Sequence, residues 1–276
     1  MKHPITLFLL LTFSILAAHA QTGMNIPAEP LTIGEVRVLR SEILHEERIL
    51  NIYLPYGYDK EKAYPVIYLL DGSIDEDFVH ITGLAQFFRL QFNMPDFIIV
   101  GIANVDRKRD FTFHTDIKEL QEHYPTTGHS EAFIRFLELE LQPYIQSVYK
   151  TQETRYLIGQ SLGGLLATEI LLKKPELFSH YLIVSPSLWW DNESLLDQAR
   201  PLIGQQAALN KYVYISVGKQ EDKIMQREAK QLAGILKGAQ KPGLTVVFLP
   251  LAKENHATIL HQSINEAFKG LFPYKE

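Results

Sequence analysis

Residues 155–167 read Arg155-Tyr156-Leu157-Ile158-Gly159-Gln160-Ser161-Leu162-Gly163-Gly164-Leu165-Leu166-Ala167. The short apolar run at 156–158 predicts a buried strand. It leads directly into Gly-x-Ser-x-Gly at 159–163, and a helical pattern follows at 162–172. Strand, sharp turn and helix in this order are typical of a nucleophile elbow, which holds a serine hydroxyl above the edge of a sheet. Ser161 is therefore the candidate nucleophile.

The glycines beside Ser161 fit this interpretation. The sharp turn strains the backbone at the serine, and Gly159 and Gly163 have no Cβ to collide with the adjoining strand and helix. The hydroxyl then lies at a helix N-terminus, where developing negative charge is favoured. The alternative is an ordinary Gly/Ser turn at a helix start, which the flanking strand and helix patterns disfavour.

A serine hydroxyl is a weak nucleophile at neutral pH, so it needs a base that is itself oriented by an acid. In folds with this elbow the chain order is Ser, acid, His, and the acid and base lie on loops at strand ends. His256 lies between the last predicted strand and the last predicted helix, which makes it the predicted base. His261 follows about one turn later and is predicted to lie on the helix surface.

Two acids follow the strand predicted at 212–217, namely Glu221 and Asp222. We favour Glu221 because it lies nearer the strand end, where the ligand-side loops of a parallel sheet converge. Asp222 remains the alternative acid. It also suits the N-cap of the helix predicted from residue 224.

The oxyanion of an acyl-transfer intermediate needs two backbone N–H donors. The residue after the nucleophile, Leu162, supplies one in this kind of site. The other is expected from the loop after the strand predicted at 64–70, where Ser73 and Gly72 are the candidates.

The rest of the chain predicts one α/β domain over residues 21–276, with a mostly parallel central sheet and helices on both faces. Alternating patterns at 34–40 and 48–55 indicate an antiparallel pair at the sheet edge. Residues 105–127 show no clear period, and a loop of that length is usually functional or mobile. Ser130 is expected to cap the helix that follows. The further predicted strands are 64–70, 96–102, 178–184, 212–217 and 244–249, and the predicted helices are 78–92, 130–146, 162–172, 192–202, 224–236 and 258–268.

Residues 1–20 have the features of a signal peptide. Lys2 and His3 give a basic start, 5–16 is an apolar run, and Ala18-His19-Ala20 fits a cleavage site. The run is short for a membrane span, and no later segment is apolar for long enough. We expect the mature chain to begin at Gln21 and to be periplasmic or secreted. The alternative is an uncleaved anchor.

The composition excludes several classes of function. The formal net charge is −5, which argues against a nucleic-acid partner because such proteins present a basic face. The chain has no Cys, which excludes a Cys nucleophile and a thiolate metal site. His114, His123 and His129 lie at no regular interval, so no metal ion or other cofactor is expected.

Several motifs together resemble the Putative esterase branch of the α/β-hydrolase superfamily. That branch includes siderophore trilactone esterases, S-formylglutathione hydrolases, feruloyl esterases and mycolyltransferases. The resemblance spans residues 35–272 and implies an α/β-hydrolase fold and a serine esterase that acts on ester or lactone bonds without a metal. The matching pieces are Val66-Ile67-Tyr68-Leu69-Leu70-Asp71-Gly72, Gly159-Gln160-Ser161-Leu162-Gly163-Gly164, Lys174-Pro175-Glu176-Leu177-Phe178, Ser185-Pro186-Ser187-Leu188-Trp189-Trp190, Val217-Gly218 with Glu221, and Asn255-His256.

The Ser-Pro-Ser-Leu-Trp-Trp run is most similar to the ferric-siderophore esterases. Because ferric siderophores are anionic, the resemblance implies cationic side chains at the site, and Arg107 and Arg109 are candidates. A solvated charge run is the alternative for these residues. Trp189 and Trp190 are candidates to stack on aromatic rings of a substrate, or to form a wall of the cleft.

A small-molecule ester is thus the expected partner, with a ferric-siderophore-type trilactone as the leading substrate. A carbohydrate-linked ester, such as a feruloyl or acetyl ester, is the second hypothesis. A broad short-chain esterase and an acyltransferase are further enzyme hypotheses. The rival hypothesis from a different class is a non-catalytic binding protein of the same fold, which the presence of candidates for nucleophile, base and acid disfavours.

Overall fold

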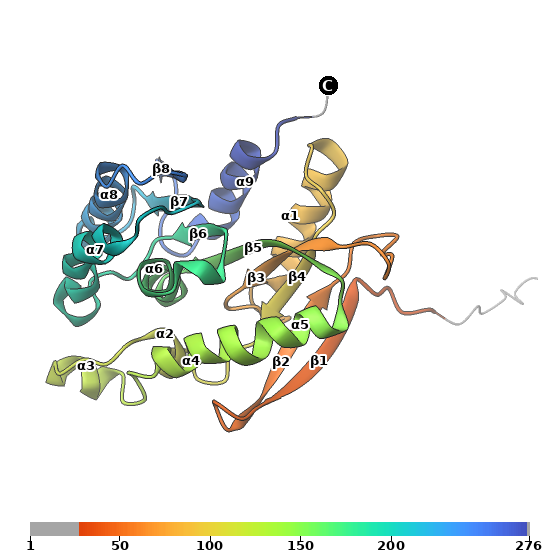
Figure 1. The fold of residues 1–276 in the computed structure, drawn as a ribbon, viewed down its shortest axis with the longest axis horizontal. Coiled ribbons are helices and arrows are strands. Elements are labelled where there is room, and N and C mark those ends of the chain that lie inside the picture. Colours follow the sequence, from red (N-terminus) through yellow and green to blue (C-terminus); the bar gives the residue numbers. More distant parts are fainter. Residues whose placement is uncertain (1–27, 275–276) are drawn as a thin grey trace, which may run out of the picture. The chain divides into compact units, whose positions relative to one another are not determined.

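The described part of the chain is built on one mixed sheet (Figure 1). The computed structural model describes residues 28–274, and its strands follow the order β1-β2-β4-β3-β5-β6-β7-β8. The predicted signal peptide and its cleavage site lie outside the described residues. The strands are β1 (Gly34–Ser41), β2 (Glu46–Tyr53), β3 (Tyr64–Leu69), β4 (Ile98–Ile102), β5 (Thr151–Gln160), β6 (His180–Val184), β7 (Lys211–Gly218) and β8 (Leu244–Leu251).

The pairing of the strands matches the hydrophobic patterns. β1 pairs with β2, and β2 with β4, in antiparallel register, while β4, β3, β5, β6, β7 and β8 are joined in parallel. The predicted antiparallel pair at a sheet edge is therefore confirmed. Every residue of β3 and β4 is buried, as expected of strands covered on both faces.

Helices cover both faces of the sheet, which confirms the predicted α/β architecture. α1 (Phe78–Gln91) and α9 (Ile259–Leu271) bury apolar residues on one face. The opposite face is covered by α4 (Ser130–Phe136), α5 (Gln142–Val148), α6 (Leu162–Lys173), α7 (Ser194–Gln205) and α8 (Lys223–Gly238). No helix among residues 28–274 combines the length and the apolar character that a membrane crossing requires.

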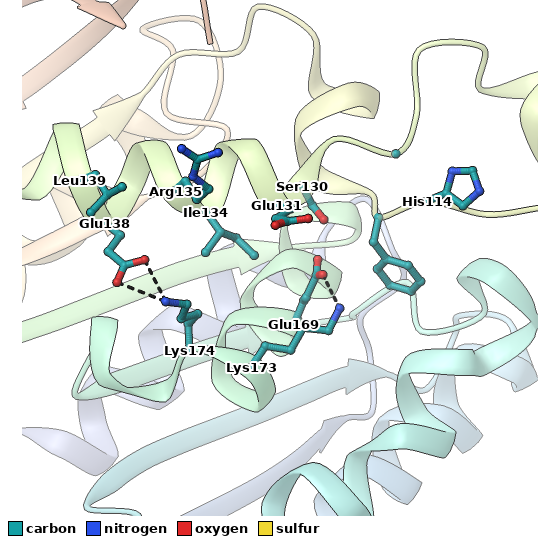
Figure 2. A pocket seen from close by; sticks show the side chains of 12 residues that line it. His114, Ser130, Glu131, Ile134, Arg135, Glu138, Leu139, Glu169, Lys173 and Lys174 are labelled. Atoms are coloured by element: carbon teal, nitrogen blue, oxygen red, sulfur yellow. Dashed lines mark hydrogen bonds and ion pairs between the residues drawn. The ribbon is translucent and has the colours of Figure 1, made fainter. Parts of the chain in front are cut away.

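The helix predicted at 130–146 is present but differs from the prediction at its start. α4 continues through a π-helical segment, η1 (Leu137–Leu141), into α5. His129 is the N-cap and Ser130 is the first helical residue, so the prediction that Ser130 caps the helix is wrong. The Ser130 hydroxyl is instead buried without a hydrogen-bond partner, in the lining of a pocket (Figure 2).

Two other segments also depart from the sequence patterns. Residues 105–127 contain two short helices, α2 (Arg107–Phe111) and α3 (Lys118–His123), each too short to show a helical period. The helix predicted at 192–202 starts at Ser194, because Asp191, Asn192 and Glu193 all have positive φ and cannot continue a right-handed helix.

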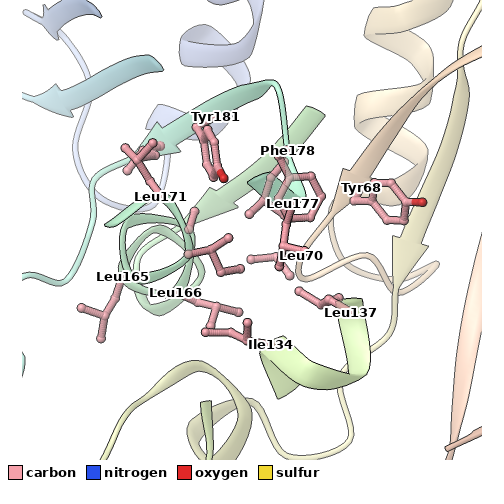
Figure 3. Packing of buried hydrophobic residues seen from close by; sticks show 14 of the residues in the cluster. Tyr68, Leu70, Ile134, Leu137, Leu165, Leu166, Leu171, Leu177, Phe178 and Tyr181 are labelled. Atoms are coloured by element: carbon pink, nitrogen blue, oxygen red, sulfur yellow. The ribbon is translucent and has the colours of Figure 1, made fainter. Parts of the chain in front are cut away.

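The elbow helix α6 is buried along almost its entire length. Figure 3 shows Leu165, Leu166 and Leu171 of α6 packed among side chains from the sheet and from the α4–η1 helix. These neighbours include Leu70, which directly follows β3, and Leu137. The helix that carries the candidate nucleophile is thus fixed by the core.

Candidate active site

The elbow has the geometry that its sequence predicts. β5 ends at Gln160, α6 begins at Leu162, and Ser161 lies between them with φ 59° and ψ −119°. A Cβ at Gly159 would lie 2.4 Å from the carbonyl oxygen of Gly163, so only glycine fits there. The Ser161 N–H donates to the Val184 carbonyl at 3.1 Å, which ties the strained residue to β6.

The predicted base and acid are hydrogen-bonded to each other. His256 lies on the loop after β8 and Glu221 on the loop after β7, at the carboxyl ends of two neighbouring strands. The distance from His256 Nδ1 to Glu221 Oε2 is 2.8 Å. The Glu221 side chain is fully buried, whereas the His256 side chain is 43% exposed.

The second oxygen of Glu221 is also occupied. Ser185 Oγ and the Gly218 N–H both donate to Oε1, each at 2.6 Å. Burial opposes ionisation of Glu221, but the hydrogen bonds from His256, Ser185 and Gly218 outweigh it and lower the pKa of the carboxyl group. The site therefore holds an ionised acid in a fixed orientation against the imidazole.

The alternative acid has a different role in the structure. Asp222 is the N-cap of α8, and its carboxylate accepts the Ile224 N–H at 2.7 Å. Of the two candidates, only Glu221 is hydrogen-bonded to His256.

Ser161 and His256 line the same open cavity, of about 400 Å³. In the described residues, Ser161 Oγ is hydrogen-bonded to Ser187 Oγ, at 3.3 Å, and not to the imidazole. Catalytic hydrogen bonds are often long or unformed without substrate. The Gln160 side chain donates to the His256 carbonyl at 2.6 Å and thereby links the elbow to the histidine loop.

The structure separates the two candidates for the second oxyanion donor. The Gly72 N–H already donates to the Ile102 carbonyl at 3.0 Å, so the Gly72 alternative does not fit. The Ser73 N–H donates to Glu76 Oε2 at an exposed position, at 3.2 Å, and is free for a substrate only if Glu76 moves. Leu162 is the first residue of α6, where N–H groups have no partner within the helix.

The two candidate arginines lie in different environments. Arg107 lines the cavity, but its guanidinium forms a bidentate pair with Asp71, at 2.6 and 2.9 Å. Arg109 does not line that cavity and is bound by Asp110 and Glu46, each at 2.7 Å, so the structure does not bring this candidate to the cavity at Ser161. Arg48 is paired with the same two carboxylates, so the two arginines balance them together.

The cavity around Ser161 is acidic. Glu76 and Asp77 line it together with Asp71. Burial, together with the neighbouring carboxylates Asp71 and Glu76, raises the pKa of Asp77 to about 6. The expectation that Arg107 and Arg109 make this site cationic does not match the charges present.

The paired tryptophans belong to the protein interior more than to the cavity. Trp190 is completely buried, and its Nε1–H donates to the Phe113 carbonyl at 3.0 Å, so it cannot stack on a substrate. Trp189 is partly exposed and lies near Tyr124, with a ring-centroid distance of 6.4 Å. Neither lines the cavity at Ser161.

Two residues that hold the site together were not recognised from the sequence. Ser185 orients the acid and Ser187 contacts the nucleophile, yet both lie in the Ser-Pro-Ser-Leu-Trp-Trp run, where only the tryptophans were assigned a role. The run therefore marked the position of these two serines in the sequence.

Among residues 28–274, no group of three or more His, Asp or Glu side chains is arranged to hold a metal ion.

The sheet, the elbow and the acid–base pair define a serine hydrolase of the α/β-hydrolase fold, and the family and relatives that follow make it a carboxylic ester hydrolase. A model of the Putative esterase family matches residues 41–243, and the chain belongs to that family. It is 29% identical over 262 residues to the ferri-bacillibactin esterase BesA of Bacillus subtilis (strain 168), with 85% of this chain and 88% of BesA covered.

Solved structures show the same relationship. An IroE-like serine hydrolase from Shewanella oneidensis matches with a TM-score of 0.79 and 30% identity, over 87% of this chain and 80% of that one. The BES protein from Bacillus cereus matches with a TM-score of 0.78 and 26% identity, over 90% of this chain and 98% of that one. The chain is therefore related to siderophore esterases over nearly its whole described length.

Proposed function

We propose that this protein hydrolyses carboxylic esters or lactones through Ser161, His256 and Glu221. The observation that carries the proposal is the hydrogen bond between His256 and Glu221 on the loops that face the strained elbow serine. Because Nδ1 bonds the buried carboxylate, the proton of the neutral ring lies on Nδ1, and Nε2 is left to act as the base.

In the proposed reaction, His256 Nε2 takes the proton of Ser161 as Oγ attacks the ester carbonyl. The N–H group of Leu162 stabilises the oxyanion, together with that of Ser73 once Glu76 has moved away from it. The intermediate collapses, and His256 gives its proton to the leaving alcohol. Water, deprotonated by His256, then attacks the acyl-enzyme and releases the acid and free Ser161.

A Ser161→Ala variant tests this mechanism. Hydrolysis of p-nitrophenyl acetate should fall by on the order of 10³-fold or more, and covalent labelling by a fluorophosphonate probe should be lost. Asp222→Asn serves as the folded control. A Ser161→Ala protein that retained the parent rate would contradict the assignment, and a parent protein that took no label would favour a non-catalytic binding role.

The proposed substrate is a siderophore-type trilactone. Support comes from the relatives, since BesA is named for ferri-bacillibactin and matches this chain over most of its length. Measuring kcat/KM for ferric enterobactin and for methyl ferulate distinguishes a trilactone substrate from a plant-type ester. Faster cleavage of methyl ferulate would contradict the trilactone assignment.

The charge of the cavity favours a second candidate, an ester of a neutral carbohydrate. Arg107 is neutralised by Asp71, while Glu76 and Asp77 add negative charge near Ser161. Such a site repels a highly anionic ligand and tolerates an uncharged feruloyl or acetyl ester. An acetylated or feruloylated xylan oligosaccharide in the same panel tests this candidate.

We further propose that the protein is exported, with residues 1–20 removed. The basic start, apolar run and small-residue site support this proposal. N-terminal sequencing of the protein recovered from the periplasm or medium should begin at Gln21. Recovery of a chain that retains residues 1–20, in the cytosolic fraction, would contradict it.

A further inference from the structure

A second and larger cavity lies beside α6, apart from the catalytic cavity. It measures about 780 Å³ and lies between the α4–η1 helix and the last turns of α6, next to Phe113 (Figure 2). No residue lines both cavities. Glu169, in its wall, follows Ser161 by eight residues, which corresponds to about 12 Å along a helix.

Two polar atoms in the wall of this cavity have no partner. Glu169 Oε2 and Ser130 Oγ are buried and form no hydrogen bond, and the two residues are only 2% and 0% exposed. Figure 2 shows the Ser130 hydroxyl and the Glu169 carboxylate pointing toward the same part of the pocket. An unsatisfied buried polar group is costly, so native proteins usually satisfy it with water or a ligand.

The charges around the cavity indicate what kind of ligand fits. Lys173 Nζ is held by the other oxygen of Glu169 at 2.7 Å and lies 5.2 Å from the centroid of the Phe113 ring. Lys174 is paired with Glu138 at 3.1 Å. Both lysines are therefore engaged. Arg135, which is exposed, also lines the cavity and adds a third cation. Glu169 Oε2 and the exposed Glu131 carboxylate at the rim remain as acceptors.

A ligand that satisfies both atoms must donate a hydrogen bond to each of them. A carboxylate only accepts, and a serine hydroxyl can accept, so an ammonium group with three N–H donors can satisfy Glu169 and Ser130 together. Ile134 and Leu139 supply apolar wall for the body of such a ligand. Leu139 lies in the π-helical η1, and π-helical turns are frequent at functional sites.

We propose that this cavity binds a small molecule that carries a protonated primary amine on an apolar body. The ammonium group lies between Glu169 Oε2 and Ser130 Oγ, with Glu131 at the rim, and the apolar body lies along Ile134 and Leu139. This site is independent of the ester chemistry at Ser161.

Calorimetric titration of the parent protein tests the proposal with 2-phenylethylamine as the probe. The matched probe 2-phenylethanol has the same body without the charge. The amine should bind with a saturable isotherm and at least about tenfold more tightly than the alcohol, since charge-assisted hydrogen bonds are the stronger ones. The proposal would be overturned if the two probes bound with equal affinity, or if the amine did not bind at millimolar concentration. Water would then be the occupant of the cavity.

Variants locate the bound amine. Glu169→Gln and Ser130→Ala should each weaken amine binding about tenfold or more. Glu131→Gln is a third cavity variant, and because Glu131 is exposed, this change should not affect folding. Asp77→Asn serves as the control, because the catalytic cavity is also acidic. Loss of binding in Asp77→Asn, with unchanged binding in the three cavity variants, would place the amine at Ser161 and overturn the proposal.

Discussion

At the scale of single residues, hydrogen bonds decide which of two adjacent acids meets the imidazole. Glu221 and Asp222 are neighbours in the chain, yet the first is buried against His256 and the second caps α8. The Gly218 N–H and Ser185 both donate to Glu221, so the orientation of the acid is fixed from three sides. A Cβ at Gly218 would lie 2.8 Å from Glu221 Oε1, and glycine is therefore required beside this carboxylate.

Replacing the two acids separately tests this assignment. Glu221→Gln keeps the shape but removes the charge that orients and stabilises the protonated imidazole, so kcat should fall on the order of 10²–10⁴-fold. Asp222→Asn should leave kcat near the parent value and cost at most about 1 kcal/mol of stability. Steady-state kinetics and thermal melts measure both, and the opposite ranking of the two variants in kcat would transfer the role to Asp222.

A buried acid in α8 gives the protein a pH-dependent stability. Burial, together with the neighbouring Glu193, raises the pKa of Glu228 to about 7, and its Oε2 has no hydrogen-bond partner. The folded state therefore binds this proton more tightly than the unfolded state does. This contribution to stability is fully present below the ordinary pKa of 4.5, and it is lost as pH rises toward 7.

Glu228→Gln should remove this part of the pH dependence. The variant should be less sensitive than the parent to a rise from pH 5 to pH 8, as measured by urea unfolding at each pH. Glu153→Gln, at an exposed position, should follow the parent curve. A variant whose stability fell between pH 5 and pH 8 as steeply as that of the parent would contradict the raised pKa.

At the scale of elements, the segment between β6 and α7 shows how a loop serves both the site and the core. Ser185 and Ser187 contact the acid and the nucleophile, while Trp190 is buried a few residues later. The indole N–H donates to the Phe113 carbonyl, which joins this loop to residues after α2. The buried tryptophan thus anchors a loop whose first residues orient catalytic groups.

The two tryptophans should respond differently to replacement. Trp190→Phe removes buried volume and leaves the Phe113 carbonyl without its donor, so the free energy of unfolding should fall by about 2–4 kcal/mol. Trp189→Phe, at a partly exposed position, should cost less than about 1 kcal/mol. Urea denaturation measures both values, and equal losses would show that Trp190 is not the anchor.

At the scale of the whole molecule, a buried charge network joins the sheet edge to the segment before α4. Arg48 of β2 is paired with Asp110 of α2, and both are almost completely buried. Arg109 and Glu46 complete the network, with a separation of 2.7 Å. The network explains why Arg109 is unavailable to a substrate.

Asp110→Asn should destabilise the protein by up to about 3–5 kcal/mol, because it removes the more deeply buried of the two carboxylates that are paired with Arg48. Glu46 is then the remaining charge partner of Arg48. The kcat/KM of the folded fraction on p-nitrophenyl acetate should stay near the parent value, since the network does not reach Ser161. Glu47→Gln on the exposed side of β2 is the control for a charge change. A large loss of kcat/KM with unchanged stability would mean that the network belongs to the active site.

Local sequence patterns were enough to predict the alternation of strands and helices, the edge pair, the elbow and the loops that carry His256 and Glu221. These features follow from local patterns, because a period of apolar residues and the spacing of glycines depend only on near neighbours in the chain. Three features depend on tertiary contacts: the choice between Glu221 and Asp222, the burial of Trp190 and the ion pair between Arg107 and Asp71. Each depends on side chains that are dozens of residues apart in the sequence and meet only when the sheet assembles. Local periodicity carries no information on such contacts, so the charge of the cavity could not be read from the sequence.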